Sequence, residues 1–265
     1  TLYNLISMLC LLPFTKYIVK LAEIIVKPSK NDVEKHKIFD AMLYKTPSLA
    51  VSQIGQEVLY MSSVAKENLW HATDCIMNST YYDKYKMEER EKELNKMNDE
   101  IEKILVRLSS LEISFNDEVY IGSLFHVIND IERIGDLAEN LFEYTEEAIK
   151  RKYEFSGDAK YELTKACEVC REMFDEAISI FENRDIQKFA SLNEKEEIMD
   201  DLKQSMRDNH VIRFTNGECS ADAGTVFLSI GNDLERIADH LTNIAYSIKD
   251  YVIKKTPKVQ KKPLF

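Results

Sequence analysis

Asn129 to Asn140, NDIERIGDLAEN, and Asn232 to Asn243, NDLERIADHLTN, are two copies of one twelve-residue block. Each copy contains a glutamate followed four residues later by an aspartate. On a helix, residues four apart lie on one face about one turn apart, so each copy presents two carboxylates side by side. Such a pair destabilises a helix slightly unless a cation lies over it, and its repetition indicates that it has a use. We therefore predict that each copy binds a hard metal cation.

The two carboxylate pairs are the first candidate metal ligands: Glu132 with Asp136, and Glu235 with Asp239. An arginine follows each glutamate and projects about 100° round the helix from it. We expect these arginines, Arg133 and Arg236, to serve structure or docking, for which each could pair with a carboxylate on a neighbouring helix, and not to neutralise the pair beside them. One pair offers too few ligands to hold a metal ion tightly, so a second acidic helix should face each block.

Two further helical segments carry residues four apart that could face the blocks. In the second half these are Glu196 and Asp200, and in the first half they are Glu91 and Asn95. The second half therefore offers four carboxylates, whereas the first offers three with the neutral amide of Asn95 in the fourth place. Because ligand charge tunes the affinity of hard cations, we expect the second-half site to bind metal more tightly.

Three other residues of the blocks could support the metal. His240 could be a ligand or a hydrogen-bond donor to one, although its counterpart in the first block is Leu137. Asp130 and Asp233 lie on a different face from the glutamates. There a salt bridge or a helix–helix contact is as probable as metal binding. Di-iron bundle enzymes use Glu-x-x-His, a spacing that this sequence lacks, so we expect no enzyme of that type. The alternative to a metal site is that all of these residues form a solvated acidic face of the helices.

The composition excludes several classes of protein. Seven Gly and five Pro in 265 residues are few, as is typical of long helices. The net charge of −11 argues against a nucleic-acid partner, which requires a basic surface. The five scattered cysteines indicate a reducing compartment rather than a disulfide framework. Cys167 and Cys170 form a CxxC inside a helical pattern, where we expect core or surface residues.

Residues 1–26 begin with an uncharged, largely apolar run that lasts to Thr15. The run leaves no room for the charged start of a signal peptide, and it is shorter than the roughly 20 residues of a membrane span. It is either the end of a transmembrane helix whose beginning is missing, which we favour, or an N-terminal amphipathic helix that packs on the rest of the chain. Several lysines follow, which predicts that the downstream chain lies on the cytoplasmic side of the cell membrane.

Helical periodicity from Thr46 to Val252 predicts an all-α protein close to an up-down bundle. The chain divides into a polar linker at 27–45, a three-helix repeat at 46–152, a second repeat at 153–253 and a basic tail at 254–265. Six long antiparallel helices are predicted: about Pro47–Asn78, Lys84–Leu111, Ser114 or Asn116 to Lys150, Ala159–Asn183, Ile186–Phe214 and Ala221–Val252. An offset of 103 residues superposes the two blocks, so we interpret the domain as an internal duplication.

The doubled (N/D)D(L/I)ERI(G/A)D block in two three-helix halves resembles the PhoU family of phosphate-signalling proteins, over about Ser48 to Val252. Residues 1–26 followed by LYKTPSLAVSQIGQEVLYM are similar to the junction between the last membrane helix and the cytosolic PhoU-like domain of bacterial sodium/phosphate cotransporters. The resemblance implies a PhoU-like fold with multinuclear iron or other metal clusters bound by the paired ExxxD motifs. The implied ligands are Glu132, Asp136, Glu235 and Asp239, with Glu196, Asp200 and Glu91 opposite. Asn95 occupies a position at which the family has an acidic residue.

The resemblance implies a metal-binding cytosolic regulatory domain of a sodium-dependent phosphate transporter, which modulates phosphate uptake and is not an enzyme. The alternative is a soluble PhoU-like adaptor that contacts a transporter and a sensor kinase without being part of either. The apolar start of the chain favours the first. The expected partners are the membrane part of a phosphate transporter, a phosphate-responsive sensor kinase and a second copy of the chain in a homodimer. A carboxylate-bridged metalloenzyme is a third alternative, but the sequence identifies no substrate pocket for it.

Overall fold

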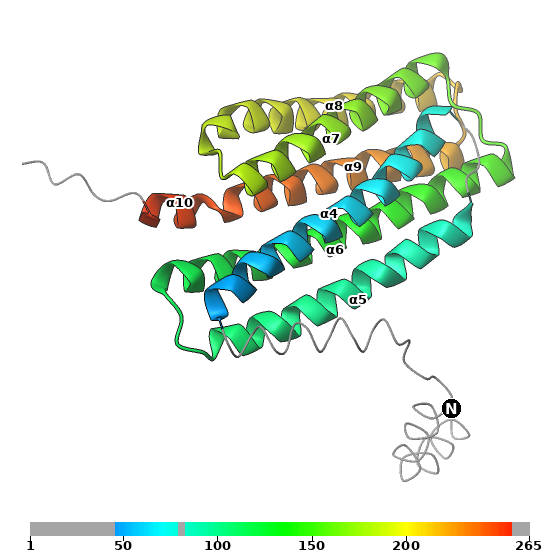
Figure 1. Ribbon diagram of the computed structural model, residues 1–265. Helices are drawn as coiled ribbons and strands as arrows, with labels where there is room; N and C mark the ends of the chain where they lie inside the picture. The colour runs from blue at the N-terminus through cyan, green and yellow to red at the C-terminus, as the bar shows by residue number, and fades with distance from the viewer. Residues whose placement is uncertain (1–45, 79–82, 256–265) are drawn as a thin grey trace, which may run out of the picture. The chain divides into compact units, whose positions relative to one another are not determined.

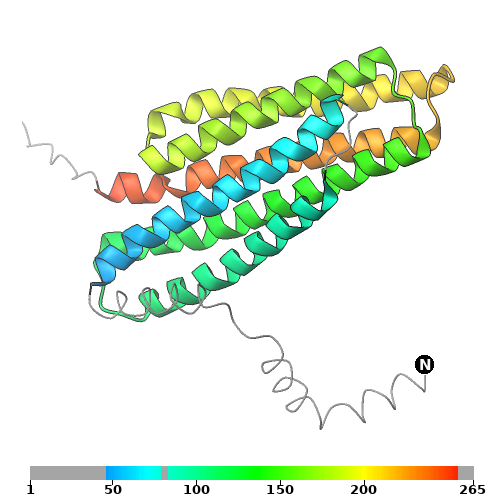
Figure 2. The same ribbon diagram turned by 45° about the vertical axis from the view of Figure 1, so that its right-hand side comes forward.

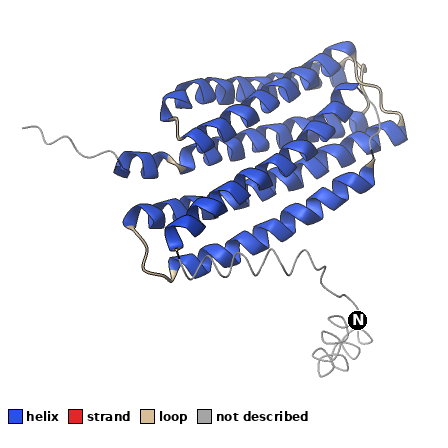
Figure 3. Ribbon diagram, viewed as in Figure 1, coloured by secondary structure: helices blue, strands red, loops and turns tan. Residues whose placement is uncertain are grey.

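The structure, a computed structural model, describes residues 46–78 and 83–255 of the 265-residue chain. These residues are almost entirely helical and include no strand (Figure 3). The predicted all-α class is therefore confirmed. The predicted N-terminal apolar helix, the linker at 27–45 and nearly all of the basic tail lie outside the described residues. None of the described helices is both long enough and apolar enough to cross a membrane.

Six long helices follow one another along the described chain and run roughly antiparallel (Figures 1 and 2). They are α4 (Pro47–Asn78), α5 (Lys84–Ser109), α6 (Phe115–Arg151), α7 (Gly157–Asn183), α8 (Phe189–Thr215) and α9 (Ala221–Ser247). The 3-10 turn η2 (Ile186–Lys188) precedes α8, and the short helix α10 (Lys249–Lys255) follows α9. From Val51 onward the described residues belong to one compact unit. The order and lengths of the long helices match the prediction closely.

Serine side chains start three of the helices. Ser114, Ser156 and Ser220 each accept a hydrogen bond from the backbone N–H three residues further on, which satisfies one of the free N–H groups of the first turn. A serine cap therefore fixes the start of α6, α7 and α9. Asp185 caps the turn η2 instead of α8 itself, so α8 begins only at Phe189.

The last predicted helix is interrupted near its end. The hydroxyl of Ser247 donates to the carbonyl of Ile244, to which the N–H of Ile248 would donate in a continuous helix. The N–H of Ile248 turns to the carbonyl of Tyr246, α9 ends, and α10 begins at Lys249. Ser62 and Ser123 donate to a carbonyl three residues back in the same way inside unbroken helices, so the bond of Ser247 alone does not explain the break.

The acidic blocks lie on α6 and α9, the central helices of the bundle. α6 packs on α5 and α9, while α9 packs on α6, α7 and α8. The core-facing side of α6 buries Leu124, Ile128, Ile131 and Ile134. The equivalent side of α9 buries Phe227, Leu234 and Ile237. Each such side chain contributes about 1.5–3 kcal/mol on burial, so apolar packing holds the blocks in place and leaves their carboxylates directed to α5 and α8.

Candidate metal sites

The first aspartate of each block lies in the contact between α6 and α9. Asp130 Oδ1 is 2.9 Å from His240 Nδ1, and the buried Asp233 lies beside Asn140 and Tyr144 of α6. Each aspartate therefore links one half of the chain to the other. The structure thus places Asp130 and Asp233 in a helix–helix contact that includes His240, and Asp233 also forms a salt bridge with Arg236.

Glu91 of α5 is deeply buried, with an exposed fraction of only 6%. It lies against Gly135 of α6, where a Cβ atom would come within 2.9 Å of Glu91 Oε2. Neither carboxylate oxygen has a hydrogen-bond partner among the described residues. Because a buried charge without a partner is costly, Glu91 needs either a proton or a cation.

Three carboxylates of α6 surround Glu91. Burial and the charges of Asp136, Glu139 and Glu132 raise the pKa of Glu91 to about 7. Sequence reasoning missed Glu139, whose signal is the spacing of four and then three residues that places all three acids on one face of the helix. Asn95, the remaining candidate of the first half, is exposed.

Arg133 folds back over the carboxylate pair of its own helix. Its Nη1 is 3.2 Å from Asp136 Oδ2 and its Nε is 3.7 Å from Glu132 Oε2. Arg236 likewise meets Asp233 on its own helix, at 3.3 Å. Among the described residues both arginines thus form their ion pairs within their own helices, because a long side chain can reach back across the angle between positions. Arg133 is 60% exposed, so its contact is weak and lies on the solvent side of the pair.

The four candidate ligands of the second half lie on α8 and α9, close enough for their charges to act on one another. Burial and the charges of Asp239 and Asp200 raise the pKa of Glu196. Burial and the charges of Glu235 and Asp200 raise the pKa of Asp239. Mutual effects of this kind require that the carboxylates are near neighbours. Asp200 and Asp239 are exposed, so this site is more open to water than the surroundings of Glu91.

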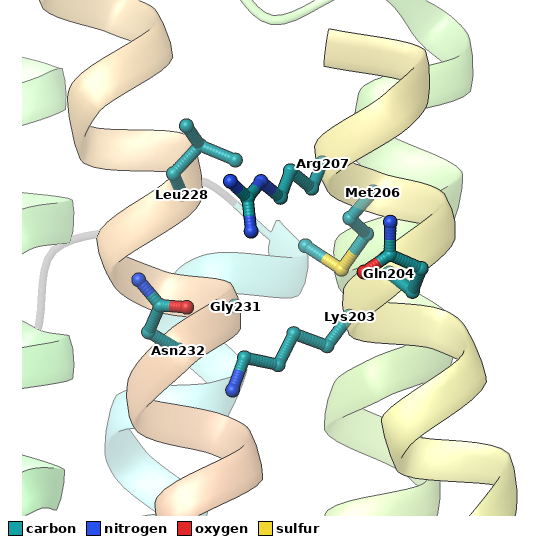
Figure 4. Close-up of a pocket in the computed structure, with 7 residues that line it drawn as sticks. All are labelled: Lys203, Gln204, Met206, Arg207, Leu228, Gly231 and Asn232. Atoms are coloured by element: carbon teal, nitrogen blue, oxygen red, sulfur yellow. The ribbon is translucent and has the colours of Figure 1, made fainter.

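A lysine that sequence reasoning missed lies within the second site. Lys203 of α8 reaches across to α9, where its Nζ is 2.8 Å from Glu235 Oε1. Figure 4 shows the side chain extending toward α9 beside Asn232. Its charge also acts to lower the pKa of Asp239, against the effect of the carboxylates. The signal in the sequence is that Lys203 follows Glu196 by seven residues and so shares its face of the helix.

The two halves differ in how well their residues could hold a metal ion. In residues 46–78 and 83–255, no three His, Cys, Asp or Glu side chains are arranged so that they could hold a metal ion. The first half nevertheless offers the donors that a hard cation prefers, including the unpartnered oxygens of Glu91. The second half already contains the cation Lys203.

The chain matches the family model of the PhoU domain twice, at residues 58–145 and 163–248. It is 29% identical over 133 residues to phosphate-specific transport system accessory protein PhoU homolog 1 of Thermotoga maritima, which covers 49% of this chain and 55% of that protein. The chain thus aligns with about half the length of that relative. It is 22% identical over 206 residues to a phosphate-specific transport system accessory protein PhoU homolog of Clostridium acetobutylicum, covering 74% and 90% respectively.

Two crystal structures share the fold. PhoU from Pseudomonas aeruginosa superposes with a TM-score of 0.70 at 20% identity, covering 77% of this chain and 97% of that one. The phosphate transport system regulatory protein PhoU from Streptococcus pneumoniae gives a TM-score of 0.69 at 19% identity, covering 79% and 98%. At these identities the likeness shows the fold alone. The two family matches fall on α4–α6 and α7–α9, which confirms the tandem duplication.

Proposed function

Because this chain belongs to the PhoU family, we propose that it is a metal-binding regulatory domain of a sodium-dependent phosphate transporter. It lies on the cytoplasmic side of the cell membrane and modulates phosphate uptake through contact with the membrane part of the transporter. Its relatives are described as accessory or regulatory proteins of phosphate transport, which supports a regulatory role in the same process.

The buried carboxylate of Glu91 is the observation that carries the metal-binding part of the proposal. A hard cation between α5 and α6 would satisfy its two unpartnered oxygens and relieve the repulsion from the acids of α6. The residues that would hold the cation are Glu91, Glu132, Asp136 and Glu139. Oxygen ligands of this kind suit iron, manganese and magnesium, and the family resemblance favours iron.

The sequence of residues 1–26 supports the transporter part of the proposal. These residues lie outside the described part of the chain, but their apolar run and following lysines are similar to the junction between a membrane helix and a cytosolic PhoU-like domain. A membrane helix joined directly to the domain would keep it beside the transporter at a high effective concentration.

An antibody raised against residues 46–255 tests whether the domain is part of a transporter. In cells that make the protein, we expect one polypeptide much larger than the 30.8 kDa of this chain, retained in the membrane fraction after an alkaline wash. The coding sequence upstream of Thr1 should then encode further apolar segments. A separate chain of this size that the wash releases would contradict the transporter proposal.

Uptake of radioactive phosphate by the same cells tests the regulatory role. Replacing Glu132 by Gln and Asp136 by Asn removes two of the proposed ligand charges, so the response of uptake to external phosphate should change while the amount of protein does not. Glu102→Gln on the exposed face of α5 is the matched control. Loss of bound metal without any change in the response would contradict a regulatory role for the metal.

A soluble adaptor is the second candidate function. The chain covers 97% and 98% of the two solved PhoU proteins, so a bundle of this size makes up nearly the whole chain in those crystals. In this alternative the partners are a separate transporter, a phosphate-responsive sensor kinase and a second copy of the chain. Crosslinking in cells distinguishes the two proposals, because only the adaptor joins the transporter and the kinase as a separate polypeptide.

A further inference from the structure

The buried residues of α5 and α8 show which positions of the two helices are equivalent. The residues that α8 buries are Leu192, Met199, Met206 and Arg213. Each follows a buried residue of α5 by 105 positions: Met87, Leu94, Ile101 and Leu108. The same offset pairs Glu91 with Glu196, the carboxylates that face the two acidic blocks. The first-half equivalent of Lys203 is therefore Asn98.

Lys203 lies where a cation shared by α8 and α9 would lie. It crosses from one helix to the other, its Nζ is 2.8 Å from Glu235, and its charge also acts on Asp239. Only 17% of the Glu235 side chain and 38% of the Lys203 side chain are exposed, so water screens the pair only in part. A metal ion bound by this ExxxD motif would have to displace the ammonium group or share its ligands.

The first half has no cation in the equivalent place. Asn98 is neutral, and its buried Oδ1 has no hydrogen-bond partner among the described residues. Arg133 covers Glu132 and Asp136 from the solvent side of α6 only. Glu91 has no ion pair within the described residues, so its two carboxylate oxygens remain available to a metal ion.

A difference of one methyl group adds to this contrast. Gly135 of the first block leaves the space that Glu91 fills, whereas the second block has Ala238 at the same position. A Cβ atom at this position occupies the space in which Glu91 Oε2 lies in the first half. Glu196 is accordingly only partly buried. The deep oxygen donor is thus a feature of the first half alone.

We propose that Lys203 is a built-in cation that fills the second acidic site, so that the chain takes up metal only between α5 and α6. The proposal rests on the metal-binding role proposed above. It reverses the order of affinity expected from the count of carboxylates, because that count left out Lys203 and Glu139. Lys203 therefore sets how much metal the chain holds and which half holds it.

Binding of Mn²⁺ to the full chain tests the proposal. The protein is stripped with a chelator and dialysed, and bound Mn²⁺ is counted from the loss of the free-ion paramagnetic resonance signal and by elemental analysis. Lys203→Asn copies the first-half residue, and Lys203→Met removes the charge without adding a ligand. Both should bind roughly twice as much Mn²⁺ as wild type. Lys103→Asn, at an exposed position of α5, is the control and should bind the wild-type amount.

Two further substitutions assign the ions to the halves. Glu91→Gln should remove Mn²⁺ from wild type but only about half of it from Lys203→Asn. Asp239→Asn should leave wild type unchanged and return Lys203→Asn to the wild-type amount. Circular dichroism confirms that each variant is folded, and Mn²⁺ should raise the melting temperature of Lys203→Asn more than that of wild type, because only the variant gains a second bound ion.

The outcomes separate this proposal from the metal-binding role itself. Wild type that loses half of its Mn²⁺ on Asp239→Asn would overturn the role of Lys203 and leave the metal-binding role intact. Mn²⁺ binding by both Lys203 variants but not by wild type would support the role of Lys203 and overturn metal binding by the native chain. No binding by any folded variant would overturn both.

Discussion

Glu91 owes its unusual chemistry to Gly135, the residue opposite. Because Gly135 has no side chain, the carboxylate of Glu91 can lie buried between α5 and α6, close to the acids of α6. Burial costs the charged form its hydration, and the neighbouring charges repel it, so both effects raise the pKa of Glu91. A bound cation would act in the opposite direction and restore the charged form.

The raised pKa of Glu91 predicts that the metal-free protein loses stability as pH rises. Between the ordinary value of 4.5 and about 7, the folded state holds a proton that the unfolded state has released. The free energy of unfolding therefore falls with pH in that range, by at most about 3 kcal/mol. Urea unfolding in the presence of a chelator between pH 4.5 and 8 measures this slope.

Glu91→Gln should flatten the slope, because the amide does not titrate. Glu102→Gln, which changes an exposed glutamate of the same helix, should leave the slope as it is. Mn²⁺ should stabilise the wild-type protein more at pH 8 than at pH 5, since it binds the charged carboxylate. An equal slope in wild type and Glu91→Gln would show that Glu91 is not the group responsible.

At the scale of the helices, a buried ion pair joins α7 to α8. Arg213 Nη1 and Nη2 lie 3.2 and 2.9 Å from the two carboxylate oxygens of Glu162, and the guanidinium lies 5.0 Å from the ring centre of Phe227. The equivalent of Arg213 in the first half is the buried Leu108, so an apolar side chain fits this position in a related setting. The pair is therefore replaceable as a unit but not one member at a time.

Thermal and urea unfolding should show this non-additivity. Arg213→Met and Glu162→Met each leave a buried charge without its partner and should cost about 3 kcal/mol. The double substitution should cost less than either single one, because no unpaired charge remains. Lys165→Met, which breaks the exposed pair with Glu168 on α7, should leave the melting temperature nearly unchanged. Additive losses in the double variant would contradict the argument.

A second junction joins α4 of the first half to α7 of the second. Arg171 donates to Asp74 Oδ1 at 2.6 Å, and to Thr73 Oγ1 and the carbonyl of Trp70 at 2.8 Å each. Its guanidinium also lies 5.1 Å from the ring centre of Trp70. Three donors in a fixed planar fork make these contacts together, and a lysine cannot reproduce them.

Arg171→Lys should therefore destabilise the protein by about 1–3 kcal/mol although the charge is kept. Trp70 is the only tryptophan of the chain, so its fluorescence reports directly on this junction. We expect a lower melting temperature and a red-shifted emission in the folded state. Arg207→Lys, an exposed arginine of α8, is the control. An unchanged spectrum and melting temperature would show that the fork geometry contributes nothing.

At the scale of the whole molecule, the two halves share one core through α6 and α9. These helices pack directly on each other, and Asp130 with His240 joins them by a polar contact. A chain that begins at residue 46 should therefore remain helical and melt in a single transition. A fragment of residues 46–152 should lack a cooperative transition, because the face of α6 that meets α9 would be exposed. Calorimetry of both chains tests this, and two transitions in the longer one would count against a shared core.

Local patterns in the sequence determined the helices and the repeat. Apolar spacing and capping residues act within about ten positions, which is why the bounds of α4, from Pro47 to Asn78, follow from the sequence alone. The repeated ExxxD pairs likewise lie on one face of their helices because that depends only on spacing. The same reasoning extends Ala221–Ser247 too far, to Val252, where the structure has a separate short helix, α10.

The chemistry of the two sites was decided only by the tertiary structure. Whether Glu91 is buried, whether Lys203 reaches Glu235, and whether Asp130 meets His240 all depend on how helices far apart in sequence align against each other. A shift of one turn moves a side chain by about 5 Å, which is enough to make or break each of these contacts. Spacing within one helix shows which residues share a face, but it does not contain the alignment between helices, and that alignment determines which charges meet.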